Sequence, residues 1–219
     1  HPRRRPAHRP RSSRRDAALG HETHRAAPGR TAPRTQKRPP PVNYRALIAR
    51  HYPTDSSLRR LLLLHSGQVC RRALDIARRH PELGADLALV EAGAMLHDIG
   101  IYLTSAPSIH CHGTAPYLMH GPLGAQLLRA EGHEALARIC ERHTGTGLTA
   151  ADIRRLELPL PAVDLLPETP EERIICYADL FHSKSHPLRF LTPSEVEARV
   201  ARFGTVGLRT FRRWRAEME

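Results

Sequence analysis

Apolar residues recur at helical spacing along most of the chain from residue 42 onward. Runs rich in Leu, Ala, Arg and Glu place apolar positions three and four residues apart, and no stretch shows the alternation of β-branched residues typical of strands. This pattern predicts an all-α domain. The expected helices cover residues 43–51, 56–80, 86–98, 117–131, 133–144, 149–155, 168–184 and 193–217.

Helix ends and long connections are also visible in the sequence. Gly100 is expected to end the third helix, and residues 169–172, Thr-Pro-Glu-Glu, resemble a capped helix start with acids in the first turn. Two connections, residues 99–116 and 156–167, are longer than simple links require. Long ordered loops in small domains are often functional, so we expect these two to lie near a site.

Charge divides the chain into two parts. Residues 1–41 carry 12 Lys and Arg against two acids and contain eight Pro, so we expect a disordered basic Pro/Arg-rich tail. The total net charge is +12, of which the tail supplies +10 and residues 42–219 only +2. This near-neutral domain argues against a dedicated nucleic-acid-binding fold, leaving at most weak binding through the tail.

The remaining composition narrows the class of protein further. No stretch reaches the roughly 18 apolar residues of a membrane span, so no membrane partner is expected. The four Cys include no CxxC pair, which favours reduced thiols and a cytoplasmic protein. Nothing resembles a P-loop, a GxGxxG turn or a GxSxG elbow, so kinase, dehydrogenase and serine-hydrolase functions have no support.

Five expected helices carry a His or Asp on the apolar face. His65, for example, shares a face with Leu62 and Val69 at helical spacing. A single inward His is more often a hydrogen-bonded core residue than a ligand. Several convergent imidazoles and carboxylates are costly to bury unless they are paired or bind a cation, so the set favours a divalent metal site. The inward residues are His65, His97 with the adjacent Asp98, His120, His143, and Asp179 with His182.

The string His97-Asp98-Ile99-Gly100, preceded by His65 and followed by Asp179, resembles the signature of the HD superfamily of metal-dependent phosphohydrolases. The resemblance covers residues 56–186 and is closest to small HDIG-domain proteins. It implies an HD-domain helical bundle over residues 42–219, with a helical extension at its C-terminal end.

Three further segments resemble HD proteins that hold two metals, such as the HD-type dinucleoside tetraphosphatases and the HD-GYP cyclic-dinucleotide phosphodiesterases. These are residues 120–128, 141–145 and 176–181. The resemblance implies one or two divalent ions per chain, of Fe, Mn, Ni, Co, Zn or Mg. It assigns His65, His97, Asp98 and Asp179 to a first ion, and His120 and His143 to a second, with Asp98 bridging.

One position departs from the family pattern. Many such phosphohydrolases carry a Lys three residues after the Asp of the HD pair, where it contacts a phosphate, and here that residue is Ile101. Lys184 and Arg142 are the candidate substitutes for substrate binding, and either is equally compatible with an ordinary surface cation.

The resemblance implies hydrolysis of a phosphate ester or anhydride in a small, nucleotide-like molecule. It does not separate a phosphomonoesterase from a phosphodiesterase or a dinucleoside polyphosphatase. Asp98 and Asp179 are expected to assist water deprotonation, and His182 to orient Asp179 or protonate the leaving group. Two alternatives stay open, a non-catalytic nucleotide-sensing module and a di-iron oxygenase of the same superfamily, and the oligomeric state is undetermined.

Overall fold

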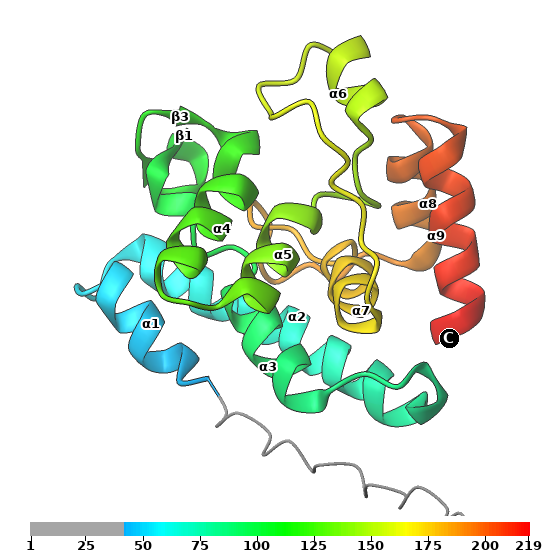
Figure 1. Cartoon of the computed structure of the whole chain (residues 1–219), viewed down its shortest axis with the longest axis horizontal. Coiled ribbons are helices and arrows are strands. Elements are labelled where there is room, and N and C mark those ends of the chain that lie inside the picture. Colours follow the sequence, from blue (N-terminus) through cyan, green and yellow to red (C-terminus); the bar gives the residue numbers. More distant parts are fainter. Residues whose placement is uncertain (1–41) are drawn as a thin grey trace, which may run out of the picture. The chain divides into compact units, whose positions relative to one another are not determined.

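The structure is a computed structural model that describes residues 42–219. The expected disordered tail, residues 1–41, lies outside the described residues. Within the described part, the expected all-α class is confirmed, because nine α-helices account for most of the chain and the only sheet is small. The helices are α1 (Tyr44–His51), α2 (Ser57–Arg79), α3 (Leu87–Leu96), α4 (His120–Ala130), α5 (Glu134–Arg142), α6 (Ala150–Arg155), α7 (Pro170–Asp179), α8 (Pro193–Ala201) and α9 (Thr205–Met218) (Figure 1).

Two helix boundaries differ from the expected ones. The single helix expected over 193–217 is wrong, because Gly204 adopts φ 122° and separates α8 from α9. Such a backbone angle is open to Gly and interrupts the helical path. The helix expected over 168–184 ends at Asp179, so the residues that follow form a loop instead of a last turn. Its start is as expected, with a capping box between Thr169 and Glu172.

Helix α3 is central to the bundle and packs against α2, α5 and α7. Gly93 allows this close approach, since a Cβ there would lie 2.6 Å from Ile139 Cδ1 of α5 and 2.9 Å from Ile175 Cδ1 of α7. The helices that carry the inward His and Asp residues are thereby brought around one centre (Figure 1). In α2, Leu62 and Val69 are buried as the periodicity predicted, and so is His65.

Helices α8 and α9 pack beside α7 and cover its outer side (Figure 1). Phe211 and Trp214 of α9 are buried, and the Phe211 ring stacks on Tyr177 of α7 at 5.7 Å between centroids. Burial of large aromatic side chains is a major source of stability, so α9 supports the helix that ends at Asp179.

The long connection over 99–116 is folded. It contains the strands β1 (Thr104–Ala106), β2 (Cys111–His112) and β3 (Ala115–Pro116), in the order β2-β1-β3. Strand β1 pairs antiparallel with β2 and parallel with β3. The short 3₁₀ turns Pro81–Leu83, Ile101–Leu103, Pro107–Ile109 and Tyr117–Met119 complete the regular structure.

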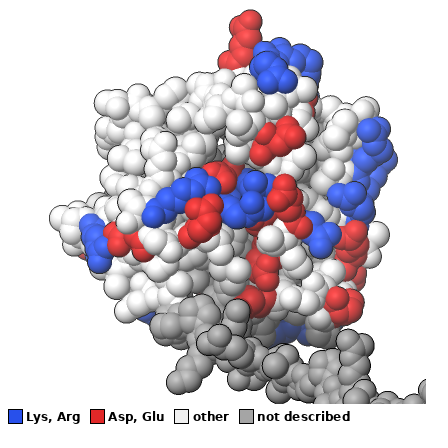
Figure 2. Space-filling model, in the orientation of Figure 1, with Lys and Arg blue, Asp and Glu red and all other residues white. Residues whose placement is uncertain are grey.

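The described surface carries charges of both signs. On the face shown in Figure 2, basic and acidic side chains are interleaved, as expected from Arg–Glu pairs such as Arg138 with Glu172, whose Nε and Oε1 lie 2.9 Å apart. None of the helices in residues 42–219 combines the length and the apolar character needed to cross a membrane.

Candidate metal centre

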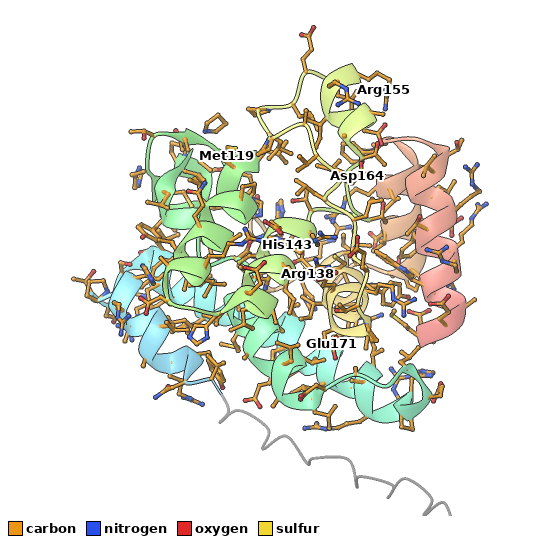
Figure 3. The ribbon with its side chains drawn as sticks, in the orientation of Figure 1. Met119, Arg138, His143, Arg155, Asp164 and Glu171 are labelled. Carbon is orange, nitrogen blue, oxygen red and sulfur yellow. The ribbon has the colours of Figure 1, made fainter. Side chains whose placement is uncertain are left out.

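Six inward side chains from five helices or helix ends meet in the interior. His65 lies within α2, His97 and Asp98 follow the end of α3, His120 opens α4, His143 follows α5 and Asp179 closes α7. Their ligand atoms form three overlapping groups, each within 4.8 Å: His65 with His97 and Asp98; His97 with His143 and Asp179; Asp98 with His120 and His143. Figure 3 shows His143 in the middle of the bundle.

A tight turn after α3 places His97 and Asp98. The backbone N–H of Ile99 donates to Leu96 O at 3.0 Å, and that of Ile101 donates to Asp98 O at 3.0 Å. Gly100 is required here, because a Cβ at this position would lie 2.3 Å from His120 O and 2.5 Å from Gly124 N. The absence of a side chain therefore lets the turn lie directly against α4, whose first residue is His120.

Three imidazoles are oriented by the same local hydrogen bond. Nδ1 of His97 lies 2.7 Å from Ala94 O, Nδ1 of His120 lies 2.7 Å from Tyr117 O, and Nδ1 of His143 lies 2.6 Å from Cys140 O. A carbonyl only accepts, so each Nδ1 must carry a proton, and in the neutral form of each ring Nε2 presents its lone pair to the centre. This is the tautomer that a metal-binding histidine uses.

Asp98 lies between two groups of imidazoles. Its Oδ2 is 3.2 Å from His65 Nε2 and 3.3 Å from His97 Nε2. Its Oδ1 is 3.4 Å from both His120 Nε2 and His143 Nε2. Each carboxylate oxygen thus faces its own pair of imidazoles, so one carboxylate can serve two cation positions.

Asp179 lies beside the imidazole pair of His65 and His97. Its Oδ1 is 3.0 Å from His65 Nε2 and 3.6 Å from His97 Nε2. The Asp98 side chain is fully buried, whereas that of Asp179 is 17% exposed. Asp179 is therefore the carboxylate that lies toward solvent.

The donor set fits divalent cations better than a network of internal hydrogen bonds. Nε2 of His120 and Nε2 of His143 are 3.0 Å apart although both are acceptors in the tautomer fixed by the backbone. Asp98 Oδ1 and Asp179 Oδ1 are buried, and no hydrogen bond from residues 42–219 reaches either oxygen. Facing lone pairs in a dry interior repel one another, and a cation between them removes that cost.

Electrostatics keep the Asp98 carboxylate ionised and the His120 imidazole neutral. Burial would raise the pKa of Asp98, but the ammonium of Lys184 and the neighbouring imidazoles hold that pKa well below its usual range. Burial lowers the pKa of His120 to about 3, so this imidazole is neutral near pH 7. Burial would also lower the pKa of His97, but Asp98 and Asp179 raise it to about 10, so a cation bound by His97 would have to displace its second proton. Ionised carboxylates and neutral imidazoles are the forms that bind metals.

Lys184 lies within the centre, although in the sequence it follows residues 176–181, the last segment that resembles two-metal HD proteins. Its Nζ is 2.7 Å from Asp98 Oδ2, and only 14% of its side chain is exposed. Burial would lower its pKa, but Asp98 and Asp179 raise the pKa above its ordinary value, so the ammonium stays charged. Ile101, the residue expected from the resemblance to be a Lys, is buried in the apolar core.

The structure also places a residue that sequence reasoning missed. The Tyr117 ring stacks on His120, with centroids 4.8 Å apart, and Tyr117 O accepts the His120 Nδ1–H. Burial raises the pKa of its hydroxyl, so it stays protonated and can donate a hydrogen bond. In the sequence, only its position three residues before His120 could have indicated that Tyr117 contacts this imidazole.

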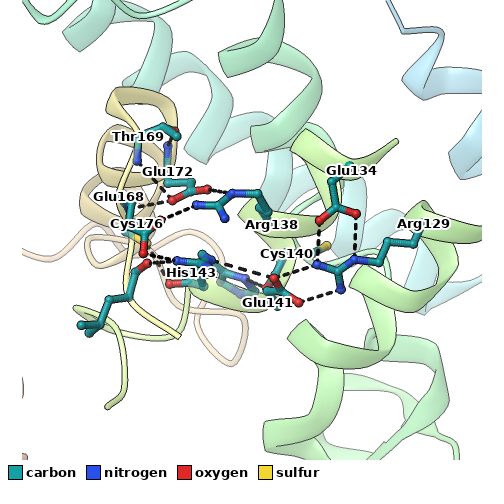
Figure 4. A network of polar contacts seen from close by, with 12 residues as sticks. Arg129, Glu134, Arg138, Cys140, Glu141, His143, Glu168, Thr169, Glu172 and Cys176 are labelled. Atoms are coloured by element: carbon teal, nitrogen blue, oxygen red, sulfur yellow. Dashed lines mark hydrogen bonds and ion pairs between the residues drawn. The ribbon is translucent and has the colours of Figure 1, made fainter. Parts of the chain in front are cut away.

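Arg142, the other candidate for substrate binding, is engaged in a structural network with Glu168, which Figure 4 shows joined to Arg138 and close to Glu172. Its Nη1 donates to Leu166 O at 2.7 Å and lies 3.0 Å from Glu168 Oε1. Arg138 joins Glu168 to Glu172 of α7 in the same network. Arg142 therefore holds the connection over 156–167 against α5 and the start of α7. Because its guanidinium is used in these contacts, Arg142 is not a proposed substrate-binding residue.

His182 lies beside the centre without contacting Asp179 through its side chain. The ring centroid is 6.4 Å from that of His65 and 5.4 Å from that of Phe190. Nε2 is buried and has no hydrogen-bond partner among the described residues, and burial lowers the pKa of the ring to about 4. His182 is thus a neutral side chain that is free to act on a ligand, and no side-chain hydrogen bond supports the expectation that it orients Asp179.

The four cysteines are free and buried, and none belongs to the possible metal-binding groups of the described chain. Cys140 Sγ lies 3.1 Å from Leu96 O and 3.0 Å from His97 O, where the thiol supports the turn that carries Asp98. Thiolate coordination therefore plays no part in this centre.

Comparison with known proteins identifies the domain type. A family model described as HD domain matches residues 62–184, which include all six clustered side chains. No solved structure matches the chain significantly.

Curated relatives share this region of the chain. An uncharacterized protein of Methanocaldococcus jannaschii is 41% identical over 107 residues, which are 48% of this chain and 56% of that protein. Proteins named tRNA (cytidine(56)-2'-O)-methyltransferase from Picrophilus torridus and Thermoplasma volcanium are each 36% identical, over 54% of this chain and 30% of their own length. The chain thus spans about half of the first relative and under a third of the other two.

Proposed function

The chain belongs to the HD domain family, and from this premise we propose that it is a metal-dependent hydrolase of a phosphate ester or anhydride in a small, nucleotide-like molecule. The observation that carries the proposal is the position of Asp98, whose two buried oxygens each face a separate pair of imidazoles. Such an arrangement suits two adjacent divalent ions that share a carboxylate.

The assignment of ligands follows the two pairs of imidazoles around Asp98. His65, His97, Asp98 and Asp179 would hold one ion, and His120, His143 and Asp98 a second. Bound ions of this kind lower the pKa of water and act as Lewis acids toward phosphoryl oxygens. The mixed imidazole and carboxylate set is compatible with Fe, Mn, Co, Ni or Zn and does not select among them.

Side chains of the centre would also position the metals, accept a proton and bind the substrate. Asp98 is fully buried and would hold the centre together, whereas Asp179, which is partly exposed, would accept a proton from the attacking water. The charged Lys184 would bind a phosphate oxygen, supplying from the loop after α7 the cation that Ile101 cannot supply. His182, which is neutral near pH 7, would donate a hydrogen bond from its ring N–H to the substrate or to the leaving group.

The methyltransferase name of two relatives is not part of this proposal. The match covers 30% of those proteins, so the named activity does not transfer to this chain. What supports a hydrolase is the family together with the donor set described above.

The test is a phosphate-release screen on protein stripped with a chelator and reloaded with Mn, Co, Ni, Fe or Mg. The substrates are nucleotides, dinucleoside polyphosphates, cyclic dinucleotides and sugar phosphates. We expect turnover of at least one phosphorylated compound with at least one metal, and none in the stripped protein. Iron-dependent oxygen consumption without phosphate release would favour the oxygenase, and nucleotide binding without turnover in any metal would favour the sensing module.

A further inference from the structure

A pocket lies beside the metal centre, and His182 is the one side chain of its lining to which a role was given above. The pocket has a volume of about 320 Å³, and its lining includes Gln68, Arg71 and Arg72 of α2 with His182, Leu188 and Phe190 from the loop after α7. This volume is at the small end of ligand pockets, which span roughly 300–1,000 Å³. The size suits one nucleobase better than a dinucleotide or a peptide.

The pocket and the metal centre are neighbours along one face of α2. His65, Gln68 and Arg72 are spaced at three and seven residues, so they share a helix face. At a rise of about 1.5 Å per residue, Arg72 lies roughly 10 Å along the axis from the metal-facing His65. His182 lines the pocket, and its ring centroid is 6.4 Å from that of His65 and 5.4 Å from that of Phe190. The separation of the two places is therefore within the length of a nucleotide.

The outer wall of the pocket is apolar and exposed. Phe190 is 50% exposed although its ring stacks on Phe181 at 5.5 Å and the Arg72 guanidinium lies 5.1 Å from its centroid, and Leu188 is 89% exposed. Large exposed apolar groups next to a polar site are typical of ligand contact. A half-exposed aromatic ring at this place offers a stacking surface for a planar base.

The inner wall carries one unused positive charge. Of the three arginines, Arg72 pairs with Glu219 at 3.0 Å and lies 3.7 Å above the Phe181 ring, and Arg189 pairs with Glu195. Arg71 has no ion-pair partner among residues 42–219. The pocket therefore combines an aromatic surface with a free guanidinium, which is the combination that nucleotides require.

The loop that forms the pocket is fixed before any ligand binds. Gln68 Nε2 donates to Pro187 O at 2.7 Å, and the backbone N–H of Leu191 donates to Phe181 O at 2.9 Å. His182 and Phe190 also form an antiparallel bridge. A wall fixed in this way costs little conformational entropy when a ligand binds.

We propose that this Arg71–Phe190 pocket binds the nucleobase end of the substrate, with the base stacked on Phe190, while the phosphate reaches the metal centre. This inference rests on the proposed function, because it assumes a phosphorylated ligand at the metals. It narrows the substrate class to nucleotides and assigns recognition to a surface separate from the metal ligands.

The experiment measures binding of the four nucleoside 5'-monophosphates and of ribose 5-phosphate, which lacks only the base, to the manganese-loaded full chain by calorimetry. We expect at least one nucleotide to bind about tenfold or more tighter than ribose 5-phosphate, as one stacked base provides. Phe190→Ala and Leu188→Glu should each remove this difference and leave the affinity for ribose 5-phosphate and the metal content unchanged. Leu188 is nearly fully exposed, so its variant tests the pocket even if Phe190→Ala fails to fold.

Phe203→Ala is the matched control, since this ring is 75% exposed and lies outside the pocket. This variant should still bind the nucleotide more tightly than ribose 5-phosphate. Equal binding of nucleotides and ribose 5-phosphate by the unaltered protein would overturn the pocket proposal and leave the hydrolase proposal standing. If no phosphorylated probe binds the loaded protein and none is hydrolysed, both proposals fail.

Discussion

At the scale of single residues, the centre depends on how each ring is held. His97, His120 and His143 all bond Nδ1 to the carbonyl three residues earlier, which fixes both the tautomer and the direction of Nε2. Helical spacing was enough to predict that these residues point inward. It could not predict that Lys184 lies against Asp98, because the loop after α7 has no periodic pattern from which a direction could be inferred.

The two imidazole pairs, His65 with His97 and His120 with His143, can be tested separately by mutation. His120→Ala or His143→Ala should lower the bound metal from about two ions per chain to about one, because both rings lie against Asp98 Oδ1, whereas His65 and His97 lie against Oδ2. Metal analysis of identically loaded proteins gives the result, with the exposed His112→Ala as control. Unchanged metal content in both variants would instead make these histidines substrate-facing residues around a single ion.

Lys184 offers a second test at this scale. Lys184→Met should retain its metal but weaken inorganic phosphate binding and raise KM by about ten- to a hundredfold, since hydrogen bonds to charged groups contribute roughly 1.5–3 kcal/mol. Lys184→Arg should keep part of the affinity. If Lys184 only neutralises Asp98, the Met variant will bind metal more tightly and phosphate as well as before.

At the scale of elements, close backbone approach positions the ligands. Gly100→Ala should push the turn away from α4, because the new Cβ would meet His120 O, and should destabilise the fold by about 1–3 kcal/mol. We also expect loss of metal affinity, because His120 moves with α4. Thermal unfolding with metal analysis measures both effects.

Gly67→Ala in α2 is the matched control, since no atom lies within 4 Å of a Cβ at that position. It should raise stability by roughly 0.5–1 kcal/mol, because Ala restricts the unfolded chain and favours the helix. Equal effects of the two substitutions would show that the turn after α3 tolerates a side chain and does not position His120.

The elements that the sequence predicted poorly are those decided by tertiary context. A single Gly within a helical pattern is often tolerated, so residues 193–217 predict one helix, yet Gly204 turns the chain and lets α9 fold back on α7. The strands within 99–116 have only two or three residues each, too few for an alternating pattern. By contrast, the long apolar stripe of α2 predicted both the helix and the inward His65.

At the scale of the whole molecule, metal and fold should be linked. Five helices or helix ends contribute to one centre whose buried oxygens lack hydrogen bonds, so removal of metal should lower the melting temperature. Free metal at about 100 times its Kd contributes roughly 2.7 kcal/mol of stability, a shift that thermal denaturation resolves easily. Identical melting curves before and after chelation would contradict a link between metal binding and the fold.

If Asp98 joins two cation positions, its replacement should empty both, and the metal bound per chain in Asp98→Ala measures this. Loaded with manganese in the same way as the unaltered protein, the variant should retain almost none. Asp75→Ala, which removes an exposed carboxylate paired with Arg79, should keep the full content. Near-stoichiometric metal in the Asp98 variant would contradict a role for Asp98 in joining the two cation positions.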